Sequence, residues 1–569
     1  MTGVLAVPAP PPIDNTWSSP AVAFAVAIAI GVVVFVLVSA ARGGIRNPSD
    51  FLLAGRRIGA GQNALAMVGG TIMYSTVIII TGHVALNGFD AILLLTAFSM
   101  STVVGVLIYA GPVRNVGGYT LGDVFALRAR ERPARIASAV LTLVVYTMFT
   151  VIALASVAMV ANRMFSTSST VNAPLVAGIT AVVGLLAVAW VYLGGMEGVT
   201  RILVLKVVLM GGLVAVLAAV VLVRYRLNLV ELLNDAEANA NPDERGLDLL
   251  TTGRLFAEGS TYASDQDPWV HLSKTFSIAV GALGMPFLFM RYFVTPNGRE
   301  ARRSAGWASI ITVAFWTCMI ILGLGAVAIL GGDAIGQVGA HRDITLPKIA
   351  DEIGGGWATG ALGGIALMST GGIFAALLLN GVTSITKDVN AARGRKREPA
   401  AELKSIRRTV LIVGVISVVF GLAMLTQLTH IFIPTSIDLG AACVLPAVVY
   451  SLFWRRYNTR GLLWTVYGGL AVTLFMALFS NGVSGDPTAL FPDADFKFVD
   501  FEPGLLGAPL GFLFGYLGTV TSRERDDARF AETQVRALTG AVVPARRDVP
   551  TTGGTDERGR ESRTPSEAL

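Results

Sequence analysis

Thirteen apolar runs, each about 17 to 25 residues long, divide this chain of 569 residues. A helix of about 20 apolar residues spans the hydrocarbon core of a bilayer, so each run is long enough to cross a membrane. With 53% hydrophobic and 14% charged residues, the composition is that of a polytopic membrane protein. We therefore predict an all-α membrane protein with about thirteen transmembrane helices. The runs lie near residues 21–41, 62–82, 91–111, 137–160, 174–193, 203–223, 272–292, 306–330, 357–385, 409–428, 431–454, 461–480 and 504–520.

The basic residues predict how the chain crosses the membrane. Loops on one side of the predicted spans carry 26 Lys and Arg residues, and those on the other side carry eight. By the positive-inside rule, this asymmetry places the N-terminus outside and the C-terminus in the cytoplasm of a cell (plasma) membrane protein. The net charge of +6 arises from these short loops, so we expect no nucleic-acid partner. The predicted inside loops are 42–57, 112–137, 195–206, 291–303, 386–408 and 455–460.

Composition also divides the chain into segments. We expect a Pro-rich, disordered external N-terminus over residues 1–20, a transmembrane domain over 21–520 and a mostly disordered cytoplasmic tail over 521–569. Within the domain, residues 225–270 form an acidic external loop, whose charge serves solvation or attracts cations. The two cysteines lie inside apolar runs, so neither a disulfide nor a Cys-based metal site is expected.

Two of the predicted spans are interrupted by helix-breaking residues. The second contains Gly69-Gly-Thr71, and the seventh contains Gly281-Ala-Leu-Gly-Met-Pro286. Such breaks expose backbone amides and carbonyls that must line a polar cavity or be buried in protein, although a packing kink is the alternative. Each break opens a block of five spans, and five is odd, so the two blocks have opposite orientation. Corresponding breaks in two halves indicate an inverted-repeat transporter. We predict a ten-helix core over about residues 62–454.

Several motifs resemble the sodium/solute symporter family, most closely its acetate and monocarboxylate permease branch. The likeness extends from about residue 50 to residue 540. It implies a LeuT-type 5+5 inverted repeat and cation-coupled symport of a small organic solute, such as acetate, propionate or pyruvate, with Na⁺ or H⁺ and no organic cofactor. The motifs are Phe51-Leu-Leu-Ala-Gly-Arg-Arg57, Gly194-Gly-Met-Glu-Gly-Val199, Gly284-Met-Pro-Phe-Leu-Phe-Met-Arg291, Thr386-Lys-Asp388 and Leu445-Pro-Ala-Val-Val-Tyr-Ser-Leu-Phe-Trp454.

The resemblance also implies a sodium site between the second and ninth spans. Its ligands would be the carbonyls of Gly69 and Ile72, together with Ala366, Ser369 and Thr370. Neutral oxygen ligands suit a hard cation that must bind reversibly. The alternative for the two hydroxyls is a hydrogen bond to the preceding turn of their own helix.

A solute anion would require partial positive charge near the breaks. The half-helix that follows the first break supplies amides at its N-terminus and hydroxyls beside them. The same side chains would otherwise pack between helices. The predicted substrate residues are Thr71, Tyr74, Ser75 and Thr76 at the first break, with Gly281 and Gly284 at the second.

The sequence departs from the permease branch at three positions. Gly70 stands where the branch usually has Asp, and Phe287 stands where it has His. Asp438, in the eleventh span, replaces a small apolar residue. An ionisable residue at membrane depth indicates a functional site, so Asp438 is a candidate for proton coupling or gating, and a cap of the break after Pro434 is the alternative.

Two other functional classes fit less well. An intramembrane enzyme would need a metal or acid–base cluster, whereas His83, His271, His341 and His430 lie near span ends or in loops without metal-ligand spacing. We therefore expect no enzymatic activity. A transporter-like membrane sensor would need a signalling domain, and the tail is too short for one.

Overall fold

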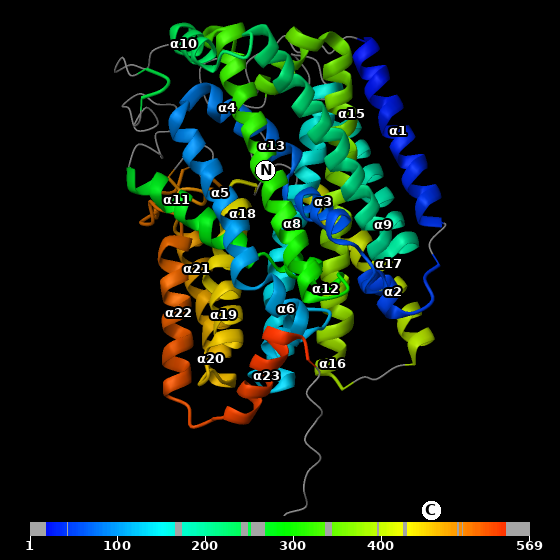
Figure 1. The fold of residues 1–569 in the computed structure, drawn as a ribbon, viewed down its shortest axis with the longest axis vertical. Helices are drawn as coiled ribbons and strands as arrows, with labels where there is room; N and C mark the ends of the chain where they lie inside the picture. The colour runs from blue at the N-terminus through cyan, green and yellow to red at the C-terminus, as the bar shows by residue number, and fades with distance from the viewer. Residues whose placement is uncertain are drawn as a thin grey trace, which may run out of the picture.

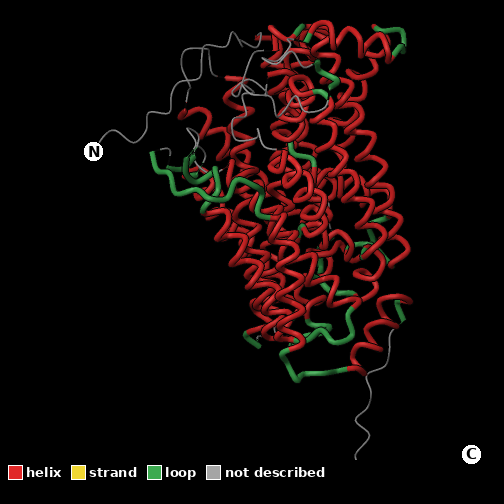
Figure 2. Tube along the Cα trace, turned by 90° about the vertical axis from the view of Figure 1, so that its left-hand side faces the viewer, coloured by secondary structure: helices red, strands yellow, loops and turns green. Residues whose placement is uncertain are grey.

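The computed structural model describes residues 19–41, 44–165, 173–240, 248–251, 268–335, 344–394, 398–424, 429–485, 489–491 and 493–541. These residues form helices packed along one long axis (Figures 1 and 2), and their β-pairing is limited to two isolated bridges. The α-helices are α1 Ser19–Ala41, α2 Pro48–Leu53, α3 Ala60–Thr71, α4 Tyr74–Asn87, α5 Phe89–Ile108, α6 Ala110–Val116, α7 Leu121–Phe125, α8 Glu131–Phe165, α9 Ala173–Arg224, α10 Leu229–Asn239, α11 Pro268–Gly281, α12 Pro286–Phe293, α13 Gly298–Leu330, α14 Gly332–Ile335, α15 Thr345–Thr383, α16 Asn390–Ala392, α17 Pro399–Ala423, α18 Thr429–Leu439, α19 Leu445–Phe453, α20 Thr459–Leu463, α21 Gly469–Leu478, α22 Gly504–Val520 and α23 Asp527–Thr539. Short 3₁₀ segments occupy η1 Ala54–Arg56 and η3 Ala282–Gly284, and π-helical turns occupy η5 Ser384–Val389, η6 Gly440–Val444 and η7 Trp464–Gly468.

Each of the thirteen predicted spans coincides with helix in the structure. In the described part of the chain, nine helical segments are long and apolar enough to cross a membrane, or ten with the bent pair α3 and α4. The helices α1 and α22 contribute shorter apolar segments. The remaining difference arises at α9, which covers two predicted spans.

A backbone reversal at Gly195 divides α9 into its two spans. A straight helix of its 52 residues would be about 78 Å long, more than twice the thickness of a hydrocarbon core. Gly195 has φ 49° and ψ −143°, outside the helical region. A Cβ at this position would lie 2.6 Å from the carbonyl oxygen of Phe51, so both conformation and space require glycine here.

The first predicted break is confirmed as a sharp bend between α3 and α4. The two helix axes differ in direction by 69°. Ile72 and Met73 connect the helices in extended conformation, with ψ values of 104° and 150°. The end of α3 packs closely on α9, because a Cβ on Gly69 would lie 2.5 Å from the carbonyl oxygen of Leu203. This contact brings the next turn of α9 against the break.

The second predicted break separates α11 from α12. The 3₁₀ turn η3 fills the gap, and Pro286 begins α12, where its missing N–H costs no helical hydrogen bond. Gly281 and Gly284 pack against the backbone of the eleventh span, since added Cβ atoms would lie 2.2 Å and 2.1 Å from the carbonyl oxygens of Ile437 and Gly440.

The helices α10 and α23 lie at opposite ends of the bundle (Figure 1). α10 falls within the predicted acidic loop. α23 occupies residues 527–539 of the tail, which the sequence predicts to be mostly disordered. It is amphipathic and docks through hydrogen bonds, including one of 2.9 Å from Asn115 Nδ2 to the carbonyl oxygen of Ala537. The Pro-rich residues 8–12 and residues 542–569 lie outside the described part.

Candidate functional site

A cavity of about 300 Å³ lies where the two broken spans meet. Its wall comes from both sides of the α3–α4 break, from the α11–α12 break, and from α5, α8, α13 and α18. The lining is mainly apolar, and hydroxyl and ring groups supply its few polar atoms. Polar and aromatic residues of the wall include Thr71, Ser75, Thr76, His83, Ser101, Thr102, Tyr109, Phe149, Phe287, Tyr292, Thr312 and Trp316.

Three of the predicted substrate residues line this cavity. Thr71, Ser75 and Thr76 are in its wall, whereas Tyr74, Gly281 and Gly284 are not. The Thr71 hydroxyl donates to the carbonyl oxygen of Val68 at 3.0 Å, so it is used within its own helix. Ser75 accepts a hydrogen bond of 2.8 Å from Ser156 on α8, which orients its hydroxyl beside the N-terminus of α4. The structure therefore brings three of the four first-break residues to one surface and uses the second-break glycines for packing.

The carbonyls predicted to bind sodium face a lysine side chain. Lys206 Nζ on α9 lies 2.9 Å from the carbonyl oxygen of Gly69 and also donates to the carbonyl oxygen of Ile72. Only 5% of Lys206 is exposed. The two backbone oxygens that the break frees are thus both hydrogen-bonded to one amino group.

The other predicted sodium ligands lie on α15, buried in the bundle. Ala366, Ser369 and Thr370 are each at most 1% exposed. The Thr370 hydroxyl donates to the carbonyl oxygen of Ala366 at 2.9 Å, the back-bonding arrangement that the sequence leaves as an alternative. Ser369 Oγ makes no hydrogen bond with the described residues. The sodium set remains a prediction.

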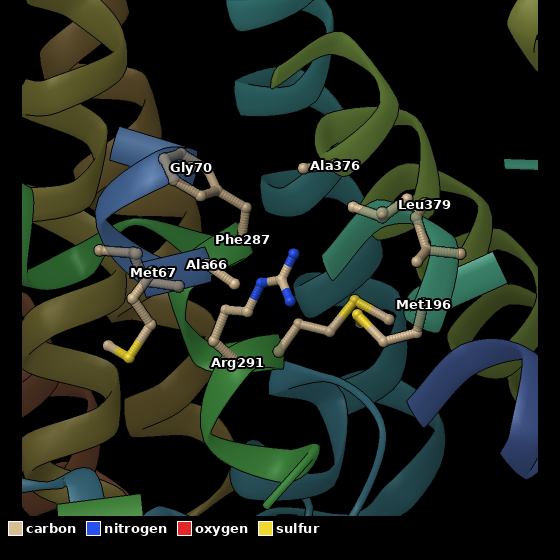
Figure 3. Close-up of a pocket in the computed structure, with 11 residues that line it drawn as sticks. Ala66, Met67, Gly70, Met196, Phe287, Arg291, Ala376 and Leu379 are labelled. Atoms are coloured by element: carbon tan, nitrogen blue, oxygen red, sulfur yellow. The ribbon is translucent and has the colours of Figure 1, made fainter. Parts of the chain in front are cut away.

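A guanidinium group lies beside the cavity, in a pocket of about 20 Å³ (Figure 3). Arg291 extends from α12 into this pocket, among Phe287, Met196 and Ala66. Its Nη1 donates to Thr200 Oγ1 at 2.8 Å, and its own carbonyl oxygen accepts from Asn63 Nδ2 at 3.0 Å. The pocket and the large cavity share the wall residues Met67, Gly70, Phe287 and Leu288.

Phe287 lines both the pocket that holds Arg291 and the large cavity. Its ring makes an edge-to-face contact with Phe149, with ring centroids 5.5 Å apart. Buried carboxylates among the described residues belong to Asp90, Asp388 and Asp438, and that of Asp388 pairs with Arg135.

Asp438 borders a second cavity of about 320 Å³. It is fully buried on α18, two residues before the π-helical turn η6 begins. Ser277, Lys274 and Glu502 line the same cavity. The two large cavities share His83, Leu94, Ile278, Ile433 and Ile437, so the cavity that Asp438 borders adjoins the central one.

Sequence reasoning missed Lys206 and Arg291. Both were assigned to inside loops, at the edges 195–206 and 291–303, and counted as topology charges, whereas the structure buries both at the breaks. A signal was present for Lys206, which lies between Leu205 and Val207 inside a long apolar run. Charged residues at such depth indicate function.

Comparison with known proteins matches the sodium:solute symporter family over residues 51–469. A monocarboxylic acid transporter of Corynebacterium glutamicum is 31% identical over 506 residues, covering 87% of this chain and 90% of the relative. The uncharacterized symporter YwcA of Bacillus subtilis is 27% identical over 508 residues, covering 87% and 94%.

Among solved structures, a Na⁺-coupled sialic acid symporter in its substrate-bound outward-open state matches with a TM-score of 0.68 and 12% identity. The match covers 89% of this chain and 99% of that one. The likeness confirms the predicted LeuT-type inverted-repeat fold.

Proposed function

Because the chain belongs to the sodium:solute symporter family, we propose that it carries short monocarboxylates, such as acetate, propionate or pyruvate, into the cell together with Na⁺ or H⁺. As a family member it is a multi-pass membrane protein and a cation-coupled symporter of a small solute. The monocarboxylate, the coupling ion and the orientation, with the N-terminus outside and the C-terminus cytoplasmic, belong to the proposal.

The observation that carries the proposal is an apolar cavity beside a buried guanidinium. A short monocarboxylate has an alkyl or acyl part that fits an apolar wall and one negative charge that needs hydrogen-bond donors. At one side of the cavity, Ser75 and Thr76 stand at the N-terminus of α4, where free amides favour an anion.

Arg291 supplies a fixed charge behind Phe287. Low polarity around the guanidinium strengthens its attraction for an anion in the neighbouring cavity. We place the carboxylate between the start of α4 and Arg291, with the apolar part of the solute toward Trp316 and Ile437. Phe287 is one of four residues that line both compartments, and in this proposal rotation of its ring admits the carboxylate to Arg291.

The proposal includes a cation site at the first break, where a positive charge stabilises the freed carbonyls. Its predicted ligands are Gly69, Ile72, Ala366, Ser369 and Thr370. Asp438 is proposed as a coupling or gating group. Its position in the wall of the second cavity, which shares five lining residues with the central cavity, supports either role.

The test is counterflow of radiolabelled acetate, propionate or pyruvate in proteoliposomes, which measures solute exchange without any ion gradient. Arg291→Gln removes the charge, and we expect the apparent KM for exchange to rise about 10- to 100-fold, the effect of losing a hydrogen bond to a charged group. Arg303→Gln makes the same change at an exposed side chain on α13 and serves as the matched control.

Failure of all three monocarboxylates to exchange would reject this class of solute. An unchanged KM in a monodisperse Arg291→Gln protein would remove Arg291 from solute binding. A protein that binds the solute and never accumulates it would instead be a sensor.

A further inference from the structure

Lys206 reaches the helix break from a neighbouring element. It belongs to the second span of α9, and the contact of Gly69 with Leu203 holds that span against the end of α3. Lys206 lies one helical turn after Leu203, so its side chain extends directly to the break. The chain therefore places an amino group at the two carbonyls that the break frees, those of Gly69 and Ile72.

These carbonyl oxygens form a site for one positive charge. They lie at the C-terminal end of α3, where the helix dipole is negative. The extended backbone of Ile72 ends the regular helical hydrogen-bond pattern there. A sodium ion and an ammonium group compete for such oxygens because each carries a single positive charge. A sodium ion on the same oxygens would lie within about 4 Å of the ammonium. Repulsion at that distance, at the effective dielectric constant of protein sites, lowers cation affinity on the order of a thousandfold.

We propose that the ammonium group of Lys206 is a tethered cation that takes the place of sodium at this break. The site predicted from the sequence then needs no Na⁺, and solute binding and exchange at the centre proceed without it. The inference rests on one part of the proposed function, namely that the break is the cation site of the symporter. It does not depend on which solute is carried.

The surrounding residues agree with this assignment. Gly70 adds no carboxylate beside the break, so the charge of a single ammonium suffices to balance the carbonyl dipoles. Together with Arg291, Lys206 gives the centre two buried basic side chains, which suits an anionic solute.

The first experiment measures binding of radioactive ²²Na⁺ to the purified full-length protein in choline buffer, and solute counterflow with and without Na⁺. We expect no saturable ²²Na⁺ binding by the wild-type protein and equal counterflow in the two media. Saturable binding at millimolar Na⁺, or counterflow that requires Na⁺, would overturn the proposal.

The second experiment vacates the site with Lys206→Ala. We expect this variant to gain saturable ²²Na⁺ binding, at least tenfold above background, and a rise in its thermal midpoint with Na⁺ but not with choline. The control is Lys348→Ala, which removes an amino group that donates to the carbonyl of Ala334 away from the break. A monodisperse Lys206→Ala protein that binds no more Na⁺ than this control refutes the assignment.

If Lys206→Ala does not fold, the wild-type measurement decides the question. Ser369→Ala and Thr370→Ala provide a further check. Each variant, made in the wild-type background with Lys206 present, should show the same counterflow with and without Na⁺. Since ²²Na⁺ binding requires no solute, absent monocarboxylate exchange would reject the proposed solute and leave the assignment of Lys206 standing.

Discussion

Asp388 should be a main determinant of stability at the end of the bundle near α23. Its carboxylate is fully buried in the π-helical turn η5. It accepts hydrogen bonds of 2.6 Å from Thr120, 3.2 Å from Ser138 and 3.3 Å from Ser384, and it forms an ion pair of 3.3 Å with Arg135. One side chain thus joins the segments around α7, α8 and α15.

The size of the effect follows from the remaining partners. Losing one partner of a buried ion pair costs about 3 to 5 kcal/mol, and hydrogen bonds to a charged group contribute about 1.5 to 3 kcal/mol each, not additively. Arg135 keeps ion pairs of 2.9 Å with both Asp123 and Glu131. We therefore expect Asp388→Ala to lower the free energy of unfolding by about 3 kcal/mol, and Asp388→Asn, which keeps one acceptor oxygen, by about half as much.

The assay is the apparent melting temperature of purified protein in detergent, followed as loss of the monodisperse peak after heating. All variants must be heated at one rate, because unfolding of large membrane proteins is commonly irreversible and the midpoint depends on the rate. The order should be wild type, Asp388→Asn, Asp388→Ala. Solute exchange at low temperature should persist, since Asp388 is outside the cavity wall. An Asp388→Ala protein as heat-resistant as the wild type would show that our reading of this network is wrong.

An exposed carboxylate offers the matched control for this experiment. Asp527 on α23 pairs with Arg455 at 2.9 Å, and both side chains are more than half exposed. The hydrogen bond from Arg455 lowers the pKa of Asp527 below its ordinary value. Any stability from this pair is therefore present at neutral pH and is lost as pH falls through the lowered pKa. Asp527→Asn should change the midpoint far less than Asp388→Asn does. High salt should remove the small difference between Asp527→Asn and the wild type.

Further variants test the reversal, the buried acid and the topology. Gly195→Ala places a Cβ at a residue with positive φ, close to the backbone of Phe51. We expect the free energy of unfolding to fall by about 1 to 3 kcal/mol, seen as a lower yield of monodisperse protein. A normal yield and midpoint would argue against the reversal. If Asp438 couples protons, Asp438→Asn should abolish proton-driven accumulation and retain counterflow, whereas unchanged pH dependence of uptake eliminates coupling. A tag after Ser522 should be cytoplasmic and one at Asn239 external, in keeping with α10 and α23 at opposite ends of the bundle (Figure 1); tags on one side would contradict the orientation.

The apolar runs and glycine breaks carried most of the fold prediction. A bilayer imposes its thickness on every helix that crosses it, so the length of an apolar run is a strong constraint that needs no knowledge of neighbours. The break in the second span was visible for the same reason, because Gly69-Gly-Thr71 weakens a helix wherever that helix lies. The two corresponding breaks also indicated the inverted repeat, and the resemblance of the motifs added the family and the LeuT type of that repeat.

The site depended on contacts that no local pattern contains. Lys206 and Arg291 occupy span edges in the sequence, where a basic residue ordinarily marks the cytoplasmic side. Their burial follows from packing between distant segments. Because Gly69 has no side chain, the backbone of Leu203 packs against it, and this contact places Lys206 at the break. Gly281 and Gly284 illustrate the opposite case, since the same flexibility that suggested a solute site serves the close approach of α18 and η6. Residue type shows what a side chain can do, but its neighbours across the bundle decide which of those roles it performs.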